Sequence, residues 1–161
     1  MKNLLIQYTQ YNLWANSKLA ELLMTLDPAL YDRELKSSFP SIRKTVNHIW
    51  GAEFIWLERL KGNSPTEFPG KNVSPDMPVN TFLEASKAFS RFTEEQAELF
   101  FTAETVYKNL KGDTFKNVNS GIVMHCMNHS TFHRGQLVTM LRESGVERGI
   151  PSTDLIAYLR I

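Results

Sequence analysis

Cysteine is almost absent from this sequence, since Cys126 is the single cysteine among 161 residues. One thiol excludes an intrachain disulfide, and chains without disulfides are typical of the reducing cytoplasm. The amino-terminal residues also lack the uninterrupted apolar stretch and the small-residue cleavage site of a secretory signal peptide. We therefore expect a cytoplasmic protein.

Long apolar runs and a charge of one sign are lacking as well. No segment approaches the ~20 apolar residues that a membrane-spanning helix needs. Eighteen Lys and Arg stand against seventeen Asp and Glu, which gives a formal net charge of +1. Nucleic-acid-binding proteins usually carry a basic excess, because their cations displace counterions from phosphates. We expect neither a nucleic acid nor a membrane as a partner.

Several familiar catalytic motifs are absent. The sequence has no phosphate-cradling Gly-rich loop and no Gly-x-Ser-x-Gly nucleophile elbow. It does contain two His-x-x-x-His pairs, but Cys126 follows His125 and Ser130 follows His129. Zinc proteases of the His-Glu-x-x-His type place their general base at that position, so their mechanism lacks its base here.

Helical periodicity, by contrast, is present in four segments. Hydrophobic residues make up 42% of the chain, and a chain of this length fits one domain with one core. Apolar side chains recur every three or four residues, which lines them along one face of a helix. The four expected helices cover residues 4–26, 41–62, 81–99 and 119–144.

The segments between these helices predict loops and a small hairpin. Residues 63–80 contain four prolines and a glycine, which indicates a long connection. Short alternating runs flank Gly112 and predict a small hairpin, and residues 153–161 predict a short helix or strand docked on the bundle. We therefore expect a single domain over residues 1–161. Its predicted fold is an all-α four-helix bundle with a long inter-helix connection and the hairpin.

Three of the four histidines lie on the fourth expected helix. At about 100° per residue, His125, His129 and His133 drift by only ~40° per step and form a ladder on one side. His133 falls inside the apolar arc, His129 at its edge and His125 beyond it. Two imidazoles one turn apart can hold a single ion. His48, at the margin of the apolar arc of the second helix, is the candidate third ligand on a facing helix.

Three neutral imidazoles suit zinc, nickel, iron or copper and do not suit calcium or magnesium. Three protein ligands would leave coordination positions open for water or substrate, as in catalytic sites. A His pair at this spacing also arises by chance on helices, and His48 alone fits an ordinary, partly buried side chain. The spacing by itself leaves both interpretations open.

Other polar residues are candidates for the surroundings of the site. Glu53 lies near the middle of an apolar arc and Arg134 near the margin of another. Because an unpaired buried charge is costly, we expect these two to pair across the bundle, with a solvent-exposed arrangement as the alternative. In a functional variant, Glu53 hydrogen-bonds a ligand imidazole. Gln136 would either reach a molecule bound at the metal or be a surface amide, and His125 would be a fourth ligand or a rim residue.

Two stretches resemble the DinB family of bacterial helical-bundle proteins. Residues 128–142, Asn-His-Ser-Thr-Phe-His-Arg-Gly-Gln-Leu-Val-Thr-Met-Leu-Arg, resemble the family signature, with His-Arg-Gly-Gln as the most specific part. Residues 46–60 resemble its second-helix motif, and residues 11–16 and 153–158 also resemble the family's sequence pattern. The resemblance spans nearly the whole chain.

This resemblance implies that His48, His129 and His133 bind one divalent transition metal (zinc, nickel or iron), and that the bundle forms a homodimer. Some relatives are thiol-dependent transferases or isomerases, so we expect a metal-dependent enzyme acting on a small molecule, as a thiol transferase or a hydrolase. The alternative is a non-catalytic, metal-stabilised binding or stress-response module. A third is a structural dimer with an empty histidine cleft. No general base is apparent, so the catalytic residues stay unassigned.

Overall fold

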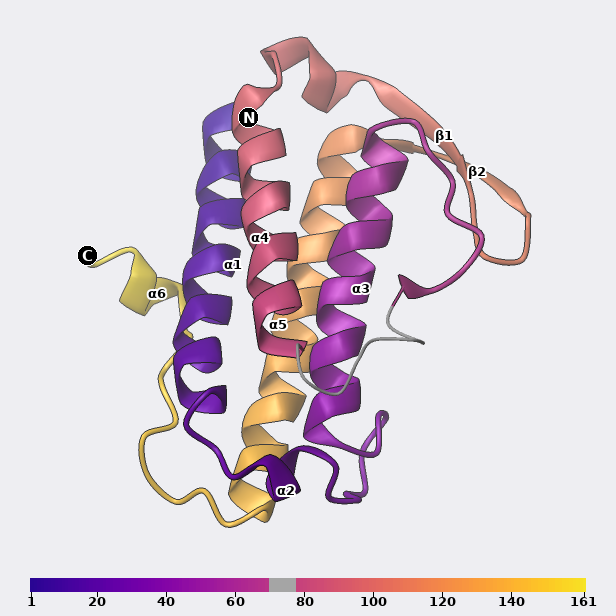
Figure 1. The fold of residues 1–161 in the computed structure, drawn as a ribbon. Helices are drawn as coiled ribbons and strands as arrows, with labels where there is room; N and C mark the ends of the chain where they lie inside the picture. Colours follow the sequence, from indigo (N-terminus) through magenta and orange to yellow (C-terminus); the bar gives the residue numbers. More distant parts are fainter. Residues whose placement is uncertain (70–77) are drawn as a thin grey trace.

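The computed structural model describes residues 1–69 and 78–161, and four long helices dominate it (Figure 1). The long helices are α1 (Lys2–Leu23), α3 (Ile42–Leu60), α4 (Pro78–Glu95) and α5 (Asn119–Glu143). Shorter elements are α2 (Pro28–Tyr31), the 3-10 helix η2 (Glu98–Thr102), strands β1 (Glu104–Lys108) and β2 (Thr114–Val118), and α6 (Leu155–Tyr158). Among the described residues, no helix is long and apolar enough to cross a membrane.

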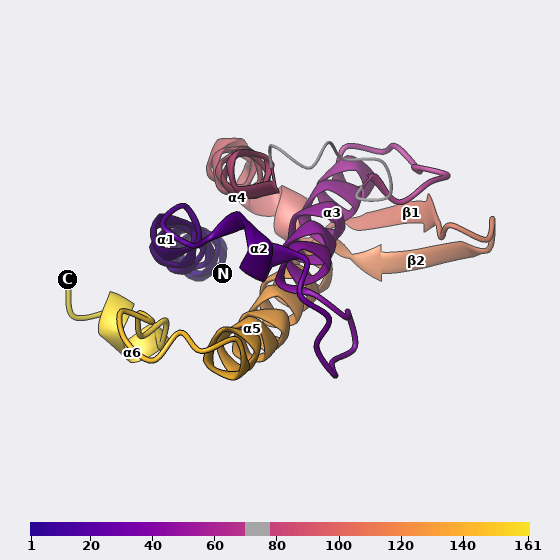
Figure 2. The same ribbon diagram turned by 60° about the horizontal axis from the view of Figure 1, so that its bottom comes forward.

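The long helices form a square bundle with the cyclic order α1, α4, α3, α5. Helices α1 and α3 each pack against both α4 and α5, and the view in Figure 2 shows the four axes around a common centre. Two clusters of buried side chains fill this centre. Leu19, Ile49 and Leu137 belong to one cluster, and Phe89 and Met127 belong to the other. The order places α3 beside α5, which is the pair that carries all four histidines.

Local sequence signals explain where the long helices begin and end. Ser41 caps α3, because its Oγ accepts a hydrogen bond from the backbone N–H of Lys44 at 3.2 Å. Gly62 and Gly145 follow the ends of α3 and α5 with φ of 88° and 92°, a conformation that glycine adopts without strain. Helix α4 begins at Pro78, three residues before the expected Thr81, since proline fits the first turn of a helix.

The predicted hairpin is present and is anchored on α3. Strands β1 and β2 pair antiparallel, with Glu104 opposite Val118 and Lys108 opposite Thr114. The buried Tyr107 ring meets the Trp56 ring of α3 edge-on at 5.3 Å. Because of this sheet, the expectation of an all-α fold is wrong in the strict sense. The fold is a mostly helical bundle with a two-stranded sheet.

The remaining connections agree in part with the sequence. Helix α4 ends at Glu95, and the chain continues as η2, where the periodicity predicted helix up to residue 99. Within the segment 153–161, Leu155–Tyr158 form the short helix α6. The Tyr11 hydroxyl ties this segment to α1 by donating to the carbonyl of Thr153 at 2.7 Å. Within the long connection predicted over 63–80, residues 70–77 lie outside the described residues.

Candidate metal centre

Three histidines from two adjacent helices converge on one point. His48 comes from α3, and His129 and His133 lie one turn apart on α5. Each offers a ring nitrogen, and these nitrogens all lie within 4.8 Å of one another. Nε2 of His48 and Nε2 of His129 are 3.0 Å apart. The structure thus brings together the three residues that were predicted as candidate metal ligands.

The three imidazoles are held in their neutral, ligand-competent form. Burial, with a smaller effect of the His133 charge, lowers the pKa of His48 to about 4. Burial and the charges of His133, His48 and His125 lower the pKa of His129 to about 3. Burial also lowers the pKa of His133. Because desolvation disfavours the charged form, all three rings carry a free nitrogen lone pair at neutral pH.

The donor set fits a divalent transition metal. Two nitrogens bound tetrahedrally at about 2.0–2.1 Å lie about 3.3 Å apart, and the 3.0 Å between His48 and His129 is close to that separation. Among the described residues, Nδ1 of His129 is buried without a hydrogen-bond partner. Neutral nitrogen ligands favour zinc, nickel or iron over calcium or magnesium.

Phenylalanine rings surround the histidine cluster. The Phe39 ring stacks on His48 at 4.0 Å, and the Phe68 ring lies nearly parallel to His48 at 5.7 Å. Phe132 meets His133 edge-on at 5.0 Å. Phe68 reaches α3 because Gly51 has no side chain, since a Cβ there would lie 2.5 Å from the Phe68 Cζ. This apolar cover contributes to the desolvation that keeps the imidazoles neutral.

Gln136 contacts His133 and also lines a pocket beside α5. Its Oε1 lies 2.7 Å from Nδ1 of His133, and its Nε2 donates to Oγ of Ser38 at 3.2 Å. With the amide nitrogen directed to Ser38, Oε1 accepts the Nδ1–H proton, which leaves Nε2 of His133 free. The sequence did not predict this contact with His133. The three-residue spacing from His133 was the signal in the sequence.

Glu53 is completely buried, which excludes the solvent-exposed alternative, and its hydrogen bonds go to asparagine and serine side chains rather than to a histidine ring. Its carboxylate accepts hydrogen bonds from Asn12 and Asn16 of α1, Ser86 of α4 and Ser130 of α5. The expectation that Glu53 hydrogen-bonds a ligand imidazole is therefore wrong. Burial raises the pKa of Glu53, while the hydrogen bonds and the charge of Arg134 oppose that rise. Its partners show that the carboxylate belongs to the bundle core.

Arg134 is buried as well but does not contact Glu53 directly. Its Nη1 donates to Oδ1 of Asn12 and, at 3.0 Å, to Oδ1 of Asn16. Each of these asparagines also donates from Nδ2 to Glu53. The expected direct pairing is therefore wrong, and the two charges are linked only through the amides of Asn12 and Asn16. Neither asparagine was predicted as a partner of Glu53 or Arg134. Their four-residue spacing, which places both on the same face of α1, was the available signal in the sequence.

His125 lies at the rim of the cleft and outside the histidine group. Its side chain is exposed, and its ring meets the Trp56 ring edge-on at 5.0 Å. The ring centroid is 6.2 Å from that of His129. This position matches the rim residue expected from the helical wheel, and the structure does not place His125 as a fourth ligand.

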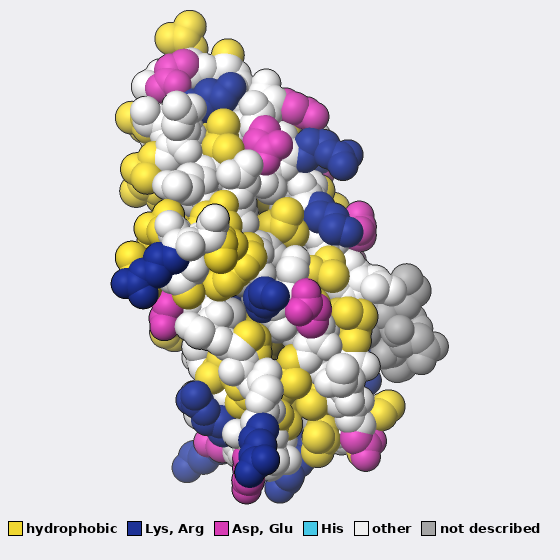
Figure 3. All heavy atoms as spheres, turned by 90° about the vertical axis from the view of Figure 1, so that its left-hand side faces the viewer, with side chains coloured by type: hydrophobic (Ala, Val, Ile, Leu, Met, Phe, Trp, Pro, Cys, Tyr) yellow, Lys and Arg dark blue, Asp and Glu magenta, His cyan; other side chains and the backbone are white. Residues whose placement is uncertain are grey.

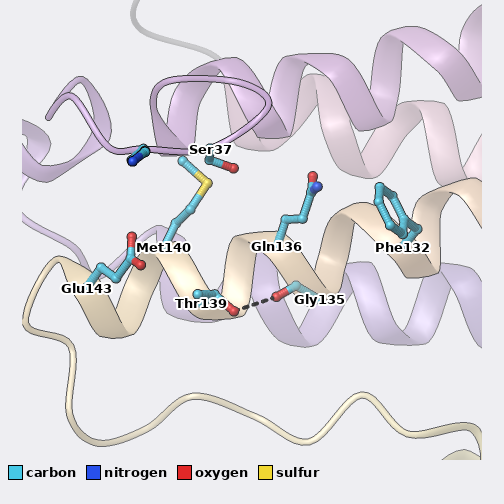
Figure 4. A pocket seen from close by; sticks show the side chains of 8 residues that line it. Ser37, Phe132, Gly135, Gln136, Thr139, Met140 and Glu143 are labelled. Atoms are coloured by element: carbon cyan, nitrogen blue, oxygen red, sulfur yellow. Dashed lines mark hydrogen bonds between the residues drawn. The ribbon is translucent and has the colours of Figure 1, made fainter.

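A pocket of about 340 Å³ lies along α5 (Figure 4). Gln136, which holds His133, forms part of its wall together with Phe132 and Met140. Lys36 and Ser37, from the connection before α3, line the other side. The pocket therefore combines apolar, amide and charged groups within reach of the residue that orients one histidine.

Comparison with known proteins extends this description. The DinB family model matches residues 1–161. Protein DinB of Bacillus subtilis (strain 168) is 27% identical over 169 residues, covering 99% of this chain and 95% of that protein. A solved DinB-like protein from Bacillus cereus ATCC 10987 aligns with a TM-score of 0.69 at 19% identity, covering 92% of this chain and 94% of that chain.

YfiT from Bacillus subtilis also shares the fold. It aligns with a TM-score of 0.65 at 13% identity, covering 90% of each chain. That protein is described as "a probable metal-dependent hydrolase with an unusual four-helix bundle topology". At such identities the structural likeness shows the fold alone, whereas the family match covers the full sequence. This chain belongs to the DinB family.

Proposed function

We propose that this protein is a metal-dependent enzyme that holds one divalent transition metal with His48, His129 and His133. One observation carries the proposal, namely the convergence of three neutral ring nitrogens within 4.8 Å. Three protein ligands leave coordination positions open, which is the arrangement of catalytic metal sites. The description of YfiT as a probable metal-dependent hydrolase supports the same class of chemistry.

The protein groups have distinct tasks in this proposal. A bound metal would supply Lewis acidity, which lowers the pKa of a bound water or thiol or polarises a carbonyl. Gln136 fixes the ring orientation of His133 through the 2.7 Å contact. Phe39 and Phe68 exclude water from one side of His48. The substrate would enter from the side of the pocket that Gln136 and Phe132 line.

The substrate class is a small molecule. The pocket of about 340 Å³ lies within the range of small-ligand sites, which is about 300–1,000 Å³. Two reactions are open to such a site. Hydrolysis is supported by the description of YfiT, and thiol transfer is supported by the family resemblance of the sequence. Both require the metal, so they share one first test.

A non-catalytic, metal-stabilised module is the second candidate function. Among the described residues, the candidate metal group contains three histidines and no carboxylate, so no carboxylate stands among the ligands to serve as a general base. This candidate predicts that metal raises the melting temperature while no substrate is turned over. Metal binding to the folded state alone produces such a rise by linkage.

A turnover screen separates the two candidates. Protein loaded with Zn²⁺, Ni²⁺ or Fe²⁺ would be assayed with small esters and amides for hydrolysis, and with low-molecular-weight thiols plus an electrophile for transfer. The enzyme proposal predicts turnover that a chelator abolishes and that added metal restores. Turnover that survives complete demetallation would contradict it, and metal-dependent stability without turnover would favour the module.

We further propose that the protein forms a homodimer. Exposed apolar side chains on α1 and α6 support this proposal, including those of Leu4, Leu155 and Ile156. Figure 3 shows apolar side chains gathered on the face that includes α1 and α6, with acidic and basic side chains interspersed. Exposed apolar patches often mark protein interfaces. Analytical ultracentrifugation would give twice the 18.5 kDa of one chain, and a monomer at micromolar concentration would refute the dimer.

A further inference from the structure

A buried polar network joins all four long helices next to the histidine cluster. Its centre is Glu53 of α3, which is 0% exposed. The carboxylate accepts hydrogen bonds from one residue or more on each of the other three helices. These donors are Asn12 and Asn16 on α1, Ser86 on α4 and Ser130 on α5. Arg134 of α5, 1% exposed, completes the network through the two asparagines.

On α5 the network residues directly follow the histidines. Ser130 comes immediately after His129, and Arg134 comes immediately after His133. Successive residues of a helix point about 100° apart. While His129 points at His48 of α3, Ser130 therefore points into the core, where its Oγ donates to Oε1 of Glu53 at 2.9 Å. One helix thus presents a metal-ligand face and an anchoring face side by side.

Rotation of α5 about its own axis would disturb both faces together. A helix with side chains has a radius of about 5–6 Å, so a rotation of about 10° moves a ring nitrogen by about 1 Å. Metal–nitrogen distances tolerate deviations of only about 0.2 Å. A site shared between α3 and α5 therefore needs a contact that fixes the rotation of α5 relative to α3. The Ser130–Glu53 hydrogen bond joins those two helices in the buried core.

We propose that Ser130 and Glu53 are positioning residues of the metal site, because their hydrogen bond fixes the rotation of α5 that sets His129 opposite His48. This inference rests on the metal site proposed above and assigns a role to residues whose hydrogen bonds do not go to a histidine ring. Ser130 acts through His129, its neighbour in the chain. Glu53 acts as the fixed acceptor on α3, the helix that also carries His48.

Ser86 provides a matched control for Ser130. Its Oγ donates to Oε2 of Glu53 at 2.7 Å, and its side chain is 1% exposed, compared with 0% for Ser130. Ser86 lies on α4, which carries none of the three ligand histidines. A network that only stabilises the fold makes both serines equivalent for metal binding. If the network positions α5, loss of the Ser130 hydroxyl should weaken metal binding more than loss of the Ser86 hydroxyl.

The experiment compares Co²⁺ binding by wild type, Ser130→Ala and Ser86→Ala. Visible absorption would report the affinity and the coordination geometry, and melting with a chelator present would report the stability of the metal-free fold. We expect both variants to melt at lower temperature. Ser130→Ala should weaken Co²⁺ binding about 10-fold or more, as loss of supporting contacts around a metal site typically does, whereas Ser86→Ala should stay within about threefold of wild type.

A Glu53→Gln variant separates the effect of the Ser130–Glu53 hydrogen bond on metal affinity from the effect of the Glu53 charge on stability. Gln keeps an oxygen that accepts from Ser130 and gains an amide that can donate to Ser86, but it removes the charge that compensates Arg134. We expect a lower melting temperature with Co²⁺ affinity within about threefold of wild type. A 10-fold loss of affinity in Glu53→Gln, or equal affinities in the two serine variants, would overturn the positioning role. Wild-type protein that binds no Co²⁺ would instead refute the proposed function itself.

Discussion

Gln136 lies one helical turn beyond His133 on α5, and its amide oxygen accepts a hydrogen bond from Nδ1 of that histidine at 2.7 Å. The amide nitrogen is in turn held by Oγ of Ser38 at 3.2 Å. The chain therefore supplies the proton acceptor that fixes the imidazole tautomer, a task that a carboxylate or a backbone carbonyl often performs at metal sites. An amide in this role adds no negative charge to the site.

Gln136→Ala should weaken metal binding about 10- to 100-fold, because His133 loses the contact that orients its ring and fixes its tautomer. Competition with a chromophoric chelator would measure the affinity. Ser38→Ala is the matched control, since it removes only the contact that holds the amide, and its loss should be smaller. Equal affinity of the Gln136→Ala variant and wild type would show that His133 needs no support.

The lowered histidine pKa values predict how metal-free stability depends on pH. His48 and His129 titrate at about 4 and about 3 in the folded chain, compared with about 6.5 for free histidine. Between these values the unfolded chain binds more protons, so stability falls as pH decreases from about 6.5 towards 3. Denaturant titrations from pH 8 to pH 4 would measure it.

The control for the pH prediction is the His48→Phe/His129→Phe double variant, which removes the two titrating groups from the cluster. Its stability should fall less between pH 6.5 and pH 4 than that of wild type. Identical slopes in the two proteins would mean that the cluster does not contribute to the pH dependence.

Gly51→Ala should uncover His48. A Cβ at position 51 would lie 2.5 Å from Cζ of Phe68, so the phenylalanine ring has to move away from the imidazole beside it. We expect faster modification of His48 by diethyl pyrocarbonate, measured by mass spectrometry. Gly135→Ala is the control, because nothing lies within 4 Å of its added Cβ. That variant should gain about 0.5–1 kcal/mol from helix propensity, and unchanged His48 reactivity in Gly51→Ala would contradict the prediction.

Asn12→Leu should destabilise the fold by about 2–4 kcal/mol, because Glu53 and Arg134 both lose a buried hydrogen-bond partner. Chemical denaturation would measure the free energy of unfolding. Asn3→Leu, at an exposed position of the same helix, should change it by less than about 0.5 kcal/mol. A similarly small change in Asn12→Leu would show that the relay contributes little to stability.

Much of the fold followed from periodicity and from caps such as Ser41, because helix ends are governed by local chemistry. The meeting of His48 with His129 was predicted from the wheel and the family resemblance, since both histidines lie at the margins of apolar arcs. The partners of Glu53 were not predicted. A buried carboxylate signals that it needs donors, but a single sequence does not say which of several polar residues on three other helices will supply them.

The roles of Gln136 and Gly51 were beyond sequence reasoning for a related reason. Gln136 sits within one turn of His133, but its side chain could equally have faced solvent until Ser38 was placed beside it. Gly51 is explained only by Phe68, seventeen residues later in the chain. Such contacts depend on how connections fold back over the helices, and local patterns do not encode that path.

Metal content is the most direct test of the proposed histidine site. Protein purified without an affinity tag would be analysed by elemental analysis beside a His129→Ala/His133→Ala double variant. We expect close to one zinc, nickel or iron ion per wild-type chain and none in the variant. Wild-type protein that contains no metal and cannot be loaded with any of the three would contradict it.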